Sequence, residues 1–553
     1  MRSPFLRVLF GSLVLSSAAL AVERPKLAVV VVIDQLSMGQ IDQYEDLFGE
    51  GGFRRLLQEG TVARDARYTG APTLTSHGHT SLATGSYASH HGIVGNDWWE
   101  RGKGKVCVGH DDRYKLLSRE TTERDGTAPT QLRAPTLADA LRWSHPGARV
   151  VTLSLKDRGA ILFGGARPRA TVWYDNVSDR WTTSTYYAPE LPAWVPKGAV
   201  SGDVAEWTRL ADPRLCTLLP SKERGGGPAE CARKLYDLRA GLDDDPAEHG
   251  DAGFEPPFPH KLAPPGSPKR GKMFLTSPYA DETLFALAEK AIVAEELGAD
   301  DIPDLLFISA SSFDYLGHDF GPESHESLDA LLREDASIAR LLKTLDAKVG
   351  KGKYVFALSA DHGVKPAPGK VERDGQSAGT IDIAAMLKDA DAALDAAFGA
   401  RDYLSPMLNC GFSYKDGALD GIDRTRADGI VLEIVRRTTG VADAYPRSLF
   451  MSALALRGDA EPYGRSYFDG RSPDFIVNPR PLWTWGDVAS HGTPYVADTR
   501  VPVLFYRGGR APMRVDGTID VVSLTPTLAL ILGSPPPAAA QAGILTQVVD
   551  HLR

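Results

Sequence analysis

Cysteine is scarce in this chain of 553 residues, which contains four cysteines and no CxxC motif. The missing motif argues against a zinc site built from cysteine pairs. Basic residues are fewer than acidic ones: the chain has 62 Lys and Arg and 71 Asp and Glu, which gives a formal net charge of −9. This balance argues against nucleic acid as a stable partner and against binding to an anionic membrane surface, both of which favour clustered positive charge.

Long apolar runs are absent beyond the amino terminus. Arg2 and Arg7 flank an otherwise uncharged start, an apolar run covers 8–20, and Ala19-Leu20-Ala21 has the small-x-small pattern of a cleavage site. The run is shorter than the roughly 20 apolar residues that cross a bilayer. We therefore predict a signal peptide at 1–21 with cleavage after Ala21, a periplasmic or secreted protein, and no membrane partner.

Secretion makes the four cysteines candidates for disulfides. Cys216 and Cys231 lie on either side of a glycine-rich stretch, Gly225 to Gly227, where a local bridge could close an exposed loop. Cys107 and Cys410 are then the remaining pair. Four cysteines allow three connectivities, and the spacing leaves the choice open.

Five short runs rich in β-branched and large apolar residues are typical of buried strands, and helical patterns lie between them. The best helical pattern has its leucines and isoleucine at three and four residue spacing over 323–348. This alternation predicts an α/β fold, a layered sheet with helices on both faces. The predicted strands are 27–33, 149–155, 304–309, 354–358 and 501–506, and the other predicted helices are 136–143, 281–297 and 381–398.

Two stretches do not follow the alternation. The first, 163–278, opens with a pattern typical of a hairpin at 171–175 and 180–186 and continues as a loop rich in Pro, Gly and charge. The second, 365–485, mixes an Ala-rich helix with short strands. We interpret both as insertions into a single domain that covers 22–553.

Acids and histidines fall at the ends of the predicted strands, where open α/β sheets bind their ligands. Each alone has an ordinary explanation, as a helix cap, a turn residue or a structural histidine. Together, these carboxylates and imidazoles are the ligand types that zinc accepts, and six are too many for one tetrahedral ion. They suit two metal ions in an open site, the arrangement that assists phosphoryl transfer. The residues are Asp34, Asp314, His318, Asp361, His362 and His491.

Several hydroxyl groups lie at the start of a predicted short helix that ends at Gly85, within the segment 70–85. A helix amino end favours anions, and its free amides can hold phosphate. Simple capping of the helix by Thr or Ser is the alternative, and for the segment taken alone it is the preferred interpretation.

Seven motifs in order carry a family resemblance: VVVVIDQL, PTLTSHGHTSLATG, HHGIVGNDWW, SLKDRGAIL, FDYLGHDFG, SADHG and SHGTPY. The chain resembles the alkaline phosphatase superfamily, most closely the bacterial phosphate-irrepressible alkaline phosphatases, which are related to nucleotide pyrophosphatases and phosphodiesterases. The resemblance covers nearly the whole mature chain. It implies a central, mostly parallel sheet between helices, with inserted cap regions, and a phosphatase with two zinc ions.

The resemblance also implies roles for individual residues. Thr75 matches the covalent nucleophile, with Thr73 and Ser76 as rival assignments. Asp34, Asp361 and His362 match the ligands of the zinc that activates it, and Thr75 completes that shell. Asp314, His318 and His491 match the ligands of the second zinc. Asn96 matches a residue that binds a phosphoryl oxygen, and the remaining matches are Lys156 and Arg158, the pair that marks the monoester-preferring subgroup.

Lys156 and Arg158 also have a physical interpretation. If the chain stays extended after its strand, the two side chains share one face. A dianionic monoester gains more from two cations than a monoanionic diester does, although a salt bridge through Asp157 is the ordinary alternative. Together with this pair, the family resemblance implies an enzyme that hydrolyses small phosphate monoesters through a phosphothreonine.

Two further functions remain open. One is a phosphodiesterase or nucleotide pyrophosphatase that uses the same site, and the other is a secreted zinc-binding or phosphate-binding protein without turnover. A sulfatase is disfavoured because position 75 is Thr, where sulfatases need a Cys or Ser, and secretion disfavours a phosphomutase. The substrate, the roles of His77 and His79 and the oligomeric state are open, and a monomer is compatible with the sequence.

Overall fold

The computed structural model describes residues 24–553 except 242, 244–247, 249, 251, 256, 453–454 and 486–488. The expected signal peptide, 1–21, lies outside the described residues. Within the described part, ten strands form a central sheet in the order β18-β2-β17-β11-β1-β10-β5-β6-β7, and β19 pairs with β2. Their bounds are β1 Leu27–Ile33, β2 Thr61–Arg67, β5 Val150–Ser154, β6 Ala170–Asp175, β7 Arg180–Thr182, β10 Asp304–Ala310, β11 Tyr354–Ser359, β17 Arg500–Tyr506, β18 Met513–Arg514 and β19 Ile519–Asp520.

The centre of the sheet is parallel. β1 pairs in parallel with both β10 and β11, β10 pairs with β5, and β5 pairs with β6. β17 is antiparallel to β11 and β2. All seven residues of β1 are fully buried, which explains their continuous apolar run, since helices cover both faces of the sheet. The carboxyl ends of these five parallel strands therefore meet at one edge.

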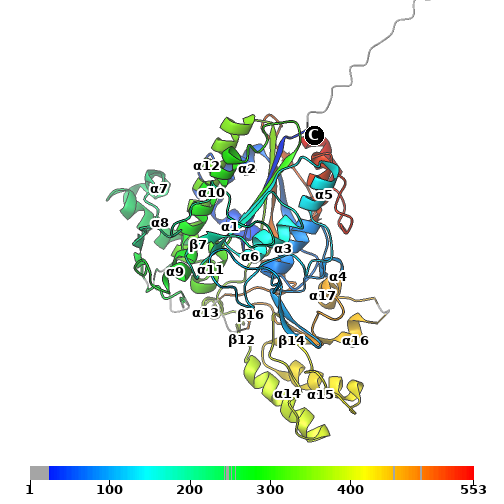
Figure 1. Ribbon diagram of the computed structural model, residues 1–553. Helices are drawn as coiled ribbons and strands as arrows, with labels where there is room; N and C mark the ends of the chain where they lie inside the picture. The colour runs from blue at the N-terminus through cyan, green and yellow to red at the C-terminus, as the bar shows by residue number, and fades with distance from the viewer. Residues whose placement is uncertain are drawn as a thin grey trace, which may run out of the picture.

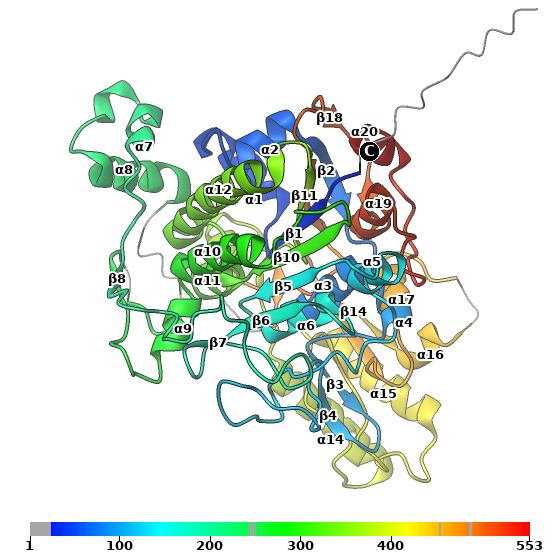
Figure 2. The same ribbon diagram turned by 45° about the horizontal axis from the view of Figure 1, so that its top comes forward.

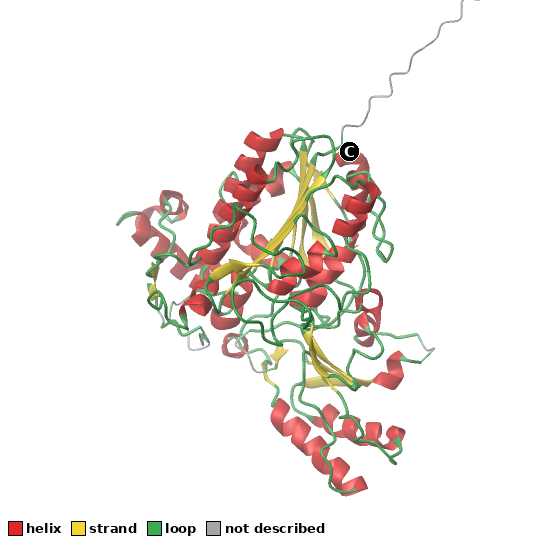
Figure 3. Ribbon diagram, in the orientation of Figure 1, coloured by secondary structure: helices red, strands yellow, loops and turns green. Residues whose placement is uncertain are grey.

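Helices lie on both sides of this sheet (Figures 1, 2 and 3), as predicted. On one side are α2 (Phe53–Glu59), α10 (Pro278–Ala294) and α12 (His325–Leu345), and on the other are α5 (Leu137–Ser144) and α19 (Leu524–Ile531). α12 begins at its cap Ser324, whose hydroxyl accepts from the Ser327 amide, and it buries the leucine stripe seen in the sequence. In the described part of the chain, no helix is both long and apolar enough to cross a membrane.

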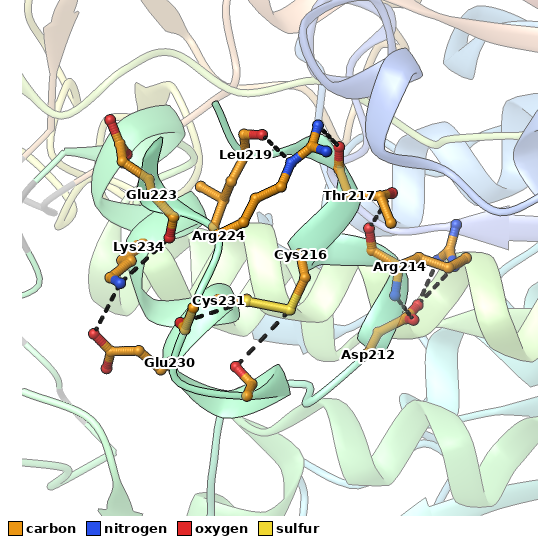
Figure 4. Close-up of a disulfide and its surroundings, with 12 residues drawn as sticks. Asp212, Arg214, Cys216, Thr217, Leu219, Glu223, Arg224, Glu230, Cys231 and Lys234 are labelled. Atoms are coloured by element: carbon orange, nitrogen blue, oxygen red, sulfur yellow. Dashed lines mark hydrogen bonds and ion pairs between the residues drawn. A yellow bond between two sulfur atoms is a disulfide. The ribbon is translucent and has the colours of Figure 1, made fainter. Parts of the chain in front are cut away.

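The hairpin expected within 163–278 is part of the central sheet, because β6 pairs with β5 and β7 pairs with β6. Beyond it, α7 (Pro213–Leu218) and α8 (Pro228–Ala240) lie at the outer side of α12 (Figure 2). A disulfide joins Cys216 of α7 to Cys231 of α8, and the Arg224 guanidinium closes the turn between them by donating to the carbonyls of Leu219 and Thr217 (Figure 4). Cys107 and Cys410 are free thiols, so only the local bridge is formed among the described residues.

The region 365–485 contains a smaller layer of its own, seen below the central sheet in Figure 1. Its sheet has the order β13-β15-β14 and packs with two helices around an apolar cluster that includes Phe412, Val431 and Phe475. The bounds are β13 Gly411–Phe412, β14 Val441–Pro446, β15 Phe475–Pro479, α14 Ile383–Phe398 and α15 Arg424–Arg437.

Candidate active site

The predicted acids and histidines converge at the carboxyl edge of the central strands. Asp34 follows β1 directly, Asp361 and His362 follow β11 after a single alanine, and α11 (Ser312–Phe320) begins just after β10. α11 carries Asp314 and His318 one turn apart, so both side chains lie on the same face of the helix. The sixth residue, His491, comes from the loop that precedes α18 (Val496–Thr499) and β17.

Two groups of three side chains have the spacing of a metal site. In the first, Asp34, Asp314 and His362 offer atoms that all lie within 4.8 Å of one another. In the second, the same is true of Asp314, His318 and His491. Asp361 stands beside the first group, with its Oδ2 3.5 Å from His362 Nε2. The six predicted ligands therefore come together, and Asp314 belongs to both groups.

All three histidines are held in the same way. Their Nδ1 atoms lie 2.9 Å from the Ala489 carbonyl oxygen (His318), 3.0 Å from that of Gly363 (His362) and 2.6 Å from that of Thr73 (His491). A carbonyl can only accept, so each Nδ1 donates, and in the neutral form of each ring the Nε2 lone pair faces the site. In metal sites such backbone partners commonly fix the ligating tautomer.

The site contains buried polar atoms without a hydrogen-bond partner among the described residues. They include Asp34 Oδ1 and His362 Nε2, which lie 3.5 Å apart. A buried acceptor without a donor costs about 1–3 kcal/mol. Two such acceptors facing each other are satisfied by a cation between them, so the residues present fit a metal ion.

Charges at the site are strongly coupled. Burial, together with the neighbouring Asp314 and Asp361 carboxylates, raises the pKa of Asp34 to about 7. Burial alone would also raise the pKa of Asp314, but the Lys156 ammonium, His318 and His491 together outweigh burial and hold that pKa well below its usual range. The Asp314 carboxylate in turn outweighs burial at His318 and raises its pKa to about 9. Burial and the neighbouring His362 and His318 keep the pKa of His491 well below its usual value.

Lys156 lies between the two groups. Its Nζ is 2.6 Å from Asp34 Oδ2 and 2.5 Å from Asp314 Oδ2. The prediction that the chain stays extended over 156–158 is wrong, because α6 (Asp157–Gly164) begins directly after Lys156. Asp157 in the first turn favours this helix start. Arg158 lies in that turn, and its buried Nε has no hydrogen-bond partner among the described residues.

The hydroxyl-rich segment forms α3 (Thr75–Thr84), and Thr75 is its first residue. The Ser76 amide and hydroxyl both donate to Asn96 Oδ1, at 3.0 and 2.7 Å. The Thr73 hydroxyl donates to the Thr493 carbonyl and accepts from the Gly492 amide. In the described chain, no residue forms a hydrogen bond with the Thr75 hydroxyl, so it alone of the three candidate nucleophiles is uncommitted.

The two ambiguous histidines have different surroundings. His79 Nδ1 lies 2.9 Å from the Thr75 carbonyl oxygen and 3.0 Å from Asp361 Oδ2, so His79 joins the start of α3 to a predicted ligand. His77 Nε2 lies 2.9 Å from the Ser466 hydroxyl, and burial lowers its pKa to about 3. Neither histidine belongs to the two groups of metal-binding geometry.

Two residues of the site were not foreseen. Gly78 lets α3 approach the β11 edge, because a Cβ built at this position would lie 2.1 Å from the Asp361 carbonyl oxygen. Gln35, directly after Asp34, donates from its side-chain amide to Asp314 Oδ1 at 2.9 Å. A glycine inside a helix pattern was the available signal for the first, whereas no local pattern indicates the second.

Comparison with known proteins gives a consistent result. Residues 28–492 match the family described as type I phosphodiesterase / nucleotide pyrophosphatase. The chain is similar to alkaline phosphatase PafA of Elizabethkingia meningoseptica, with 34% identity over 394 residues, which are 70% of this chain and 69% of the relative. It is also similar to alkaline phosphatase PhoV of Synechococcus elongatus, with 28% identity over 549 residues, which are 96% of this chain and 94% of the relative. A crystal structure of wild-type alkaline phosphatase PafA matches with a TM-score of 0.86 and 27% identity, covering 96% of this chain and 100% of that chain.

Proposed function

Because the chain belongs to the type I phosphodiesterase / nucleotide pyrophosphatase family and is an alkaline phosphatase, we propose that it hydrolyses phosphate monoesters through a phosphothreonine at a two-zinc site. The matches confirm the predicted family resemblance and the alkaline phosphatase-like fold. The observation that carries the proposal is the uncommitted Thr75 hydroxyl at the start of α3, beside converging carboxylates and imidazoles.

The ligand assignment follows the family resemblance, because by geometry Asp314 belongs to both groups of side chains and Asp361 stands beside the first. Asp34, Asp361 and His362 would hold one zinc together with the Thr75 oxygen, and Asp314, His318 and His491 would hold the other. Bound zinc supplies Lewis acidity, which lowers the pKa of a nearby hydroxyl or water and neutralises developing negative charge.

The chain's own groups then perform a double displacement. The Thr75 hydroxyl gives up its proton to solvent and its oxygen forms a bond to phosphorus while the bond to the leaving-group oxygen breaks, and the leaving group departs with a proton from solvent. Water next attacks phosphorus, the bond to the Thr75 oxygen breaks, and phosphate leaves as Thr75 regains its proton. Each displacement exchanges one P–O bond for another, so no oxidant or further reactant is required.

In this proposal three side chains hold the phosphoryl oxygens. The donors on Ser76 occupy Asn96 Oδ1, which leaves the Asn96 Nδ2 group to donate to phosphate. Lys156 Nζ and the Arg158 guanidinium add positive charge on the side of Asp34 and Asp314. Transition-state charge resides on these non-bridging oxygens, so preorganised donors there accelerate the reaction.

A monoester is the preferred substrate in this proposal because two cations approach one phosphoryl group. A second candidate function, phosphodiesterase or nucleotide pyrophosphatase activity, is favoured by the description of the matching family. A diester carries one charge fewer and gains less from Lys156 and Arg158. Comparing the rates for an aryl monoester and its methyl diester separates the two functions.

We also propose that the protein is exported to the periplasm or beyond. The disulfide between Cys216 and Cys231 supports export, since such bonds persist in oxidising compartments. Amino-terminal sequencing of the exported protein should find Val22 as the first residue. An exported protein that retains 1–21 would contradict cleavage after Ala21.

Replacement of the nucleophile tests the proposal. Thr75→Ala should abolish release of phosphate from an aryl monoester while zinc content, measured by elemental analysis, stays near two ions per chain. Thr73→Ala, which removes a hydroxyl that is already hydrogen-bonded, is the matched control and should retain turnover. Full activity of Thr75→Ala would refute the assignment, and zinc-free active protein would refute the metal dependence.

A further inference from the structure

Gln35 occupies an unusual position between the two groups of predicted ligands. It is fully buried, and its backbone φ of 71° lies in the left-handed region that residues other than glycine rarely adopt. Its backbone amide donates to Asp361 Oδ1 at 3.2 Å, and its side-chain Nε2 donates to Asp314 Oδ1 at 2.9 Å. A single residue therefore holds one carboxylate of each proposed zinc site.

The hydrogen bond from Gln35 to Asp314 forms although the conformation of Gln35 carries two unfavourable free-energy contributions. A non-glycine residue in the left-handed region costs about 1–3 kcal/mol, and a buried acceptor without a donor costs a similar amount. Gln35 carries both penalties, because its side-chain Oε1 has no hydrogen-bond partner among the described residues. Local rules are broken in this way mainly at functional sites.

Gly317 makes room for the Gln35 amide. It lies in α11 between Asp314 and His318, and a Cβ built on it would lie 1.7 Å from Gln35 Oε1. Any larger residue at this position would displace the amide, although alanine would favour the helix itself. The Gln35 amide thus occupies the space that the missing side chain of Gly317 leaves.

The contact decides which way the Asp314 carboxylate faces. Lys156 holds Oδ2, whereas Oδ1 faces His318 Nε2 at 3.3 Å and His491 Nε2 at 3.7 Å. Without the Gln35 amide, the carboxylate could rotate toward the Lys156 ammonium. We propose that Gln35 is a positioning residue that holds Asp314 Oδ1 in the ligating orientation for the second zinc, a role that rests on the proposed two-zinc function.

Zinc affinity measured by chelator competition tests this role. Gln35→Met keeps the length of the side chain and removes the amide, and Gly317→Ala displaces the amide without changing it. Each variant should lower the affinity for one of the two zinc ions about 10- to 100-fold, the range found when partners that orient metal ligands are removed. The same ion should be lost in His318→Ala, which removes a ligand of the second group.

Metal-free thermal unfolding and a double variant distinguish positioning from general damage. Gln35→Met should unfold at or near the wild-type temperature without metal, and the double variant should bind zinc no more weakly than the weaker single variant. Gly429→Ala, at an exposed position of α15 with no atom within 4 Å of the added Cβ, is the matched control and should change neither affinity.

The possible results separate this inference from the proposed function. A wild-type protein that binds fewer than two zinc ions overturns both. Two zinc ions in the wild type with unchanged affinities in Gln35→Met overturn the role of Gln35 alone. An equal loss of affinity for both zinc ions, together with a lower metal-free unfolding temperature, also overturns the role of Gln35, because that pattern indicates general loss of structure.

Discussion

Single residues at the site carry opposed charges at very short range. Lys156 Nζ contacts carboxylates of both groups, and the Asp314 carboxylate also faces two imidazoles. A buried cation that loses its partners is strongly disfavoured, so Lys156 and these acids stabilise each other in the metal-free protein. In the proposed mechanism the same ammonium binds the phosphoryl group of the substrate. Its contribution to catalysis therefore depends on the charge of that group.

Lys156→Ala should therefore affect monoesters more than diesters. We expect kcat/KM for an aryl monoester to fall about 100-fold, as for other preorganised donors, and kcat/KM for the methyl diester to fall less. Zinc affinity should be retained or raised, because the variant removes a cation that competes for Asp34 and Asp314. Lys103→Ala, at an exposed site, is the control. Equal losses for both substrates would contradict the role in substrate charge.

The sequence predicted this site well where position along a strand determined it. Asp34, Asp361 and His362 lie within three residues of the ends of two buried strands, so the parallel pairing of those strands brings them together. The sequence could not assign Asp314 to a position between both groups, nor predict its contact with Gln35. Both depend on how α11 meets the end of β1, which involves residues 279 apart in the chain.

At the scale of elements, the position of α3 against β11 determines where the proposed nucleophile lies. All ten residues of α3 are buried, and at Gly78 the helix approaches the Asp361 backbone. Because a Cβ at position 78 would lie 2.1 Å from a carbonyl oxygen, the helix could not stay in place with any other residue. The close approach therefore places Thr75 beside the predicted ligands.

Gly78→Ala should destabilise the protein in spite of the better helix propensity of alanine. Overpacking of a buried contact costs about 1–3 kcal/mol, and the displaced helix should also lower kcat for an aryl monoester. Chemical denaturation of the metal-free protein measures the first effect, with Gly429→Ala in α15 as the matched control. Unchanged stability and kcat in Gly78→Ala would show that this approach does not position Thr75.

Element types were easier to predict than their boundaries and partners. The leucine stripe predicted a helix over 323–348, and α12 covers His325–Leu345. The hairpin at 171–186 was predicted as a local unit, but its partner β5 could not be identified, since strand pairing beyond the hairpin depends on distant residues. Similarly, the apolar pattern of β5 obscured the helix start at Asp157.

At the scale of the whole molecule, a buried pair of carboxyl groups joins the helices on one side of the sheet. Asp281 of α10 accepts from the amides of Ser311 and Ser312, which begin α11, at 2.9 and 3.0 Å. Burial raises the pKa of Asp281 to about 6. Burial and the neighbouring Asp281 also raise the pKa of Glu334 on α12 well above its usual value.

This pair should make stability depend on pH. The folded pKa of Asp281 lies above its unfolded value of 3.8, so its contribution is fully present below pH 3.8 and is lost as pH rises through about 6. Asp281→Asn cannot ionise. The difference in unfolding free energy between wild type and this variant should shrink by up to about 3 kcal/mol between pH about 4 and about 7, measured by denaturation of metal-free protein. A constant difference would contradict the raised pKa.

Trapping of the covalent intermediate tests the central claim most directly. Wild-type protein incubated with an aryl monoester and quenched in acid should yield a phosphorylated peptide, and fragmentation in the mass spectrometer should place the phosphoryl group on Thr75. The Thr75→Ala protein should yield no such peptide. Phosphate on Thr73 or Ser76, or continued hydrolysis by wild-type protein with no phosphorylated residue under the same quench, would contradict the account.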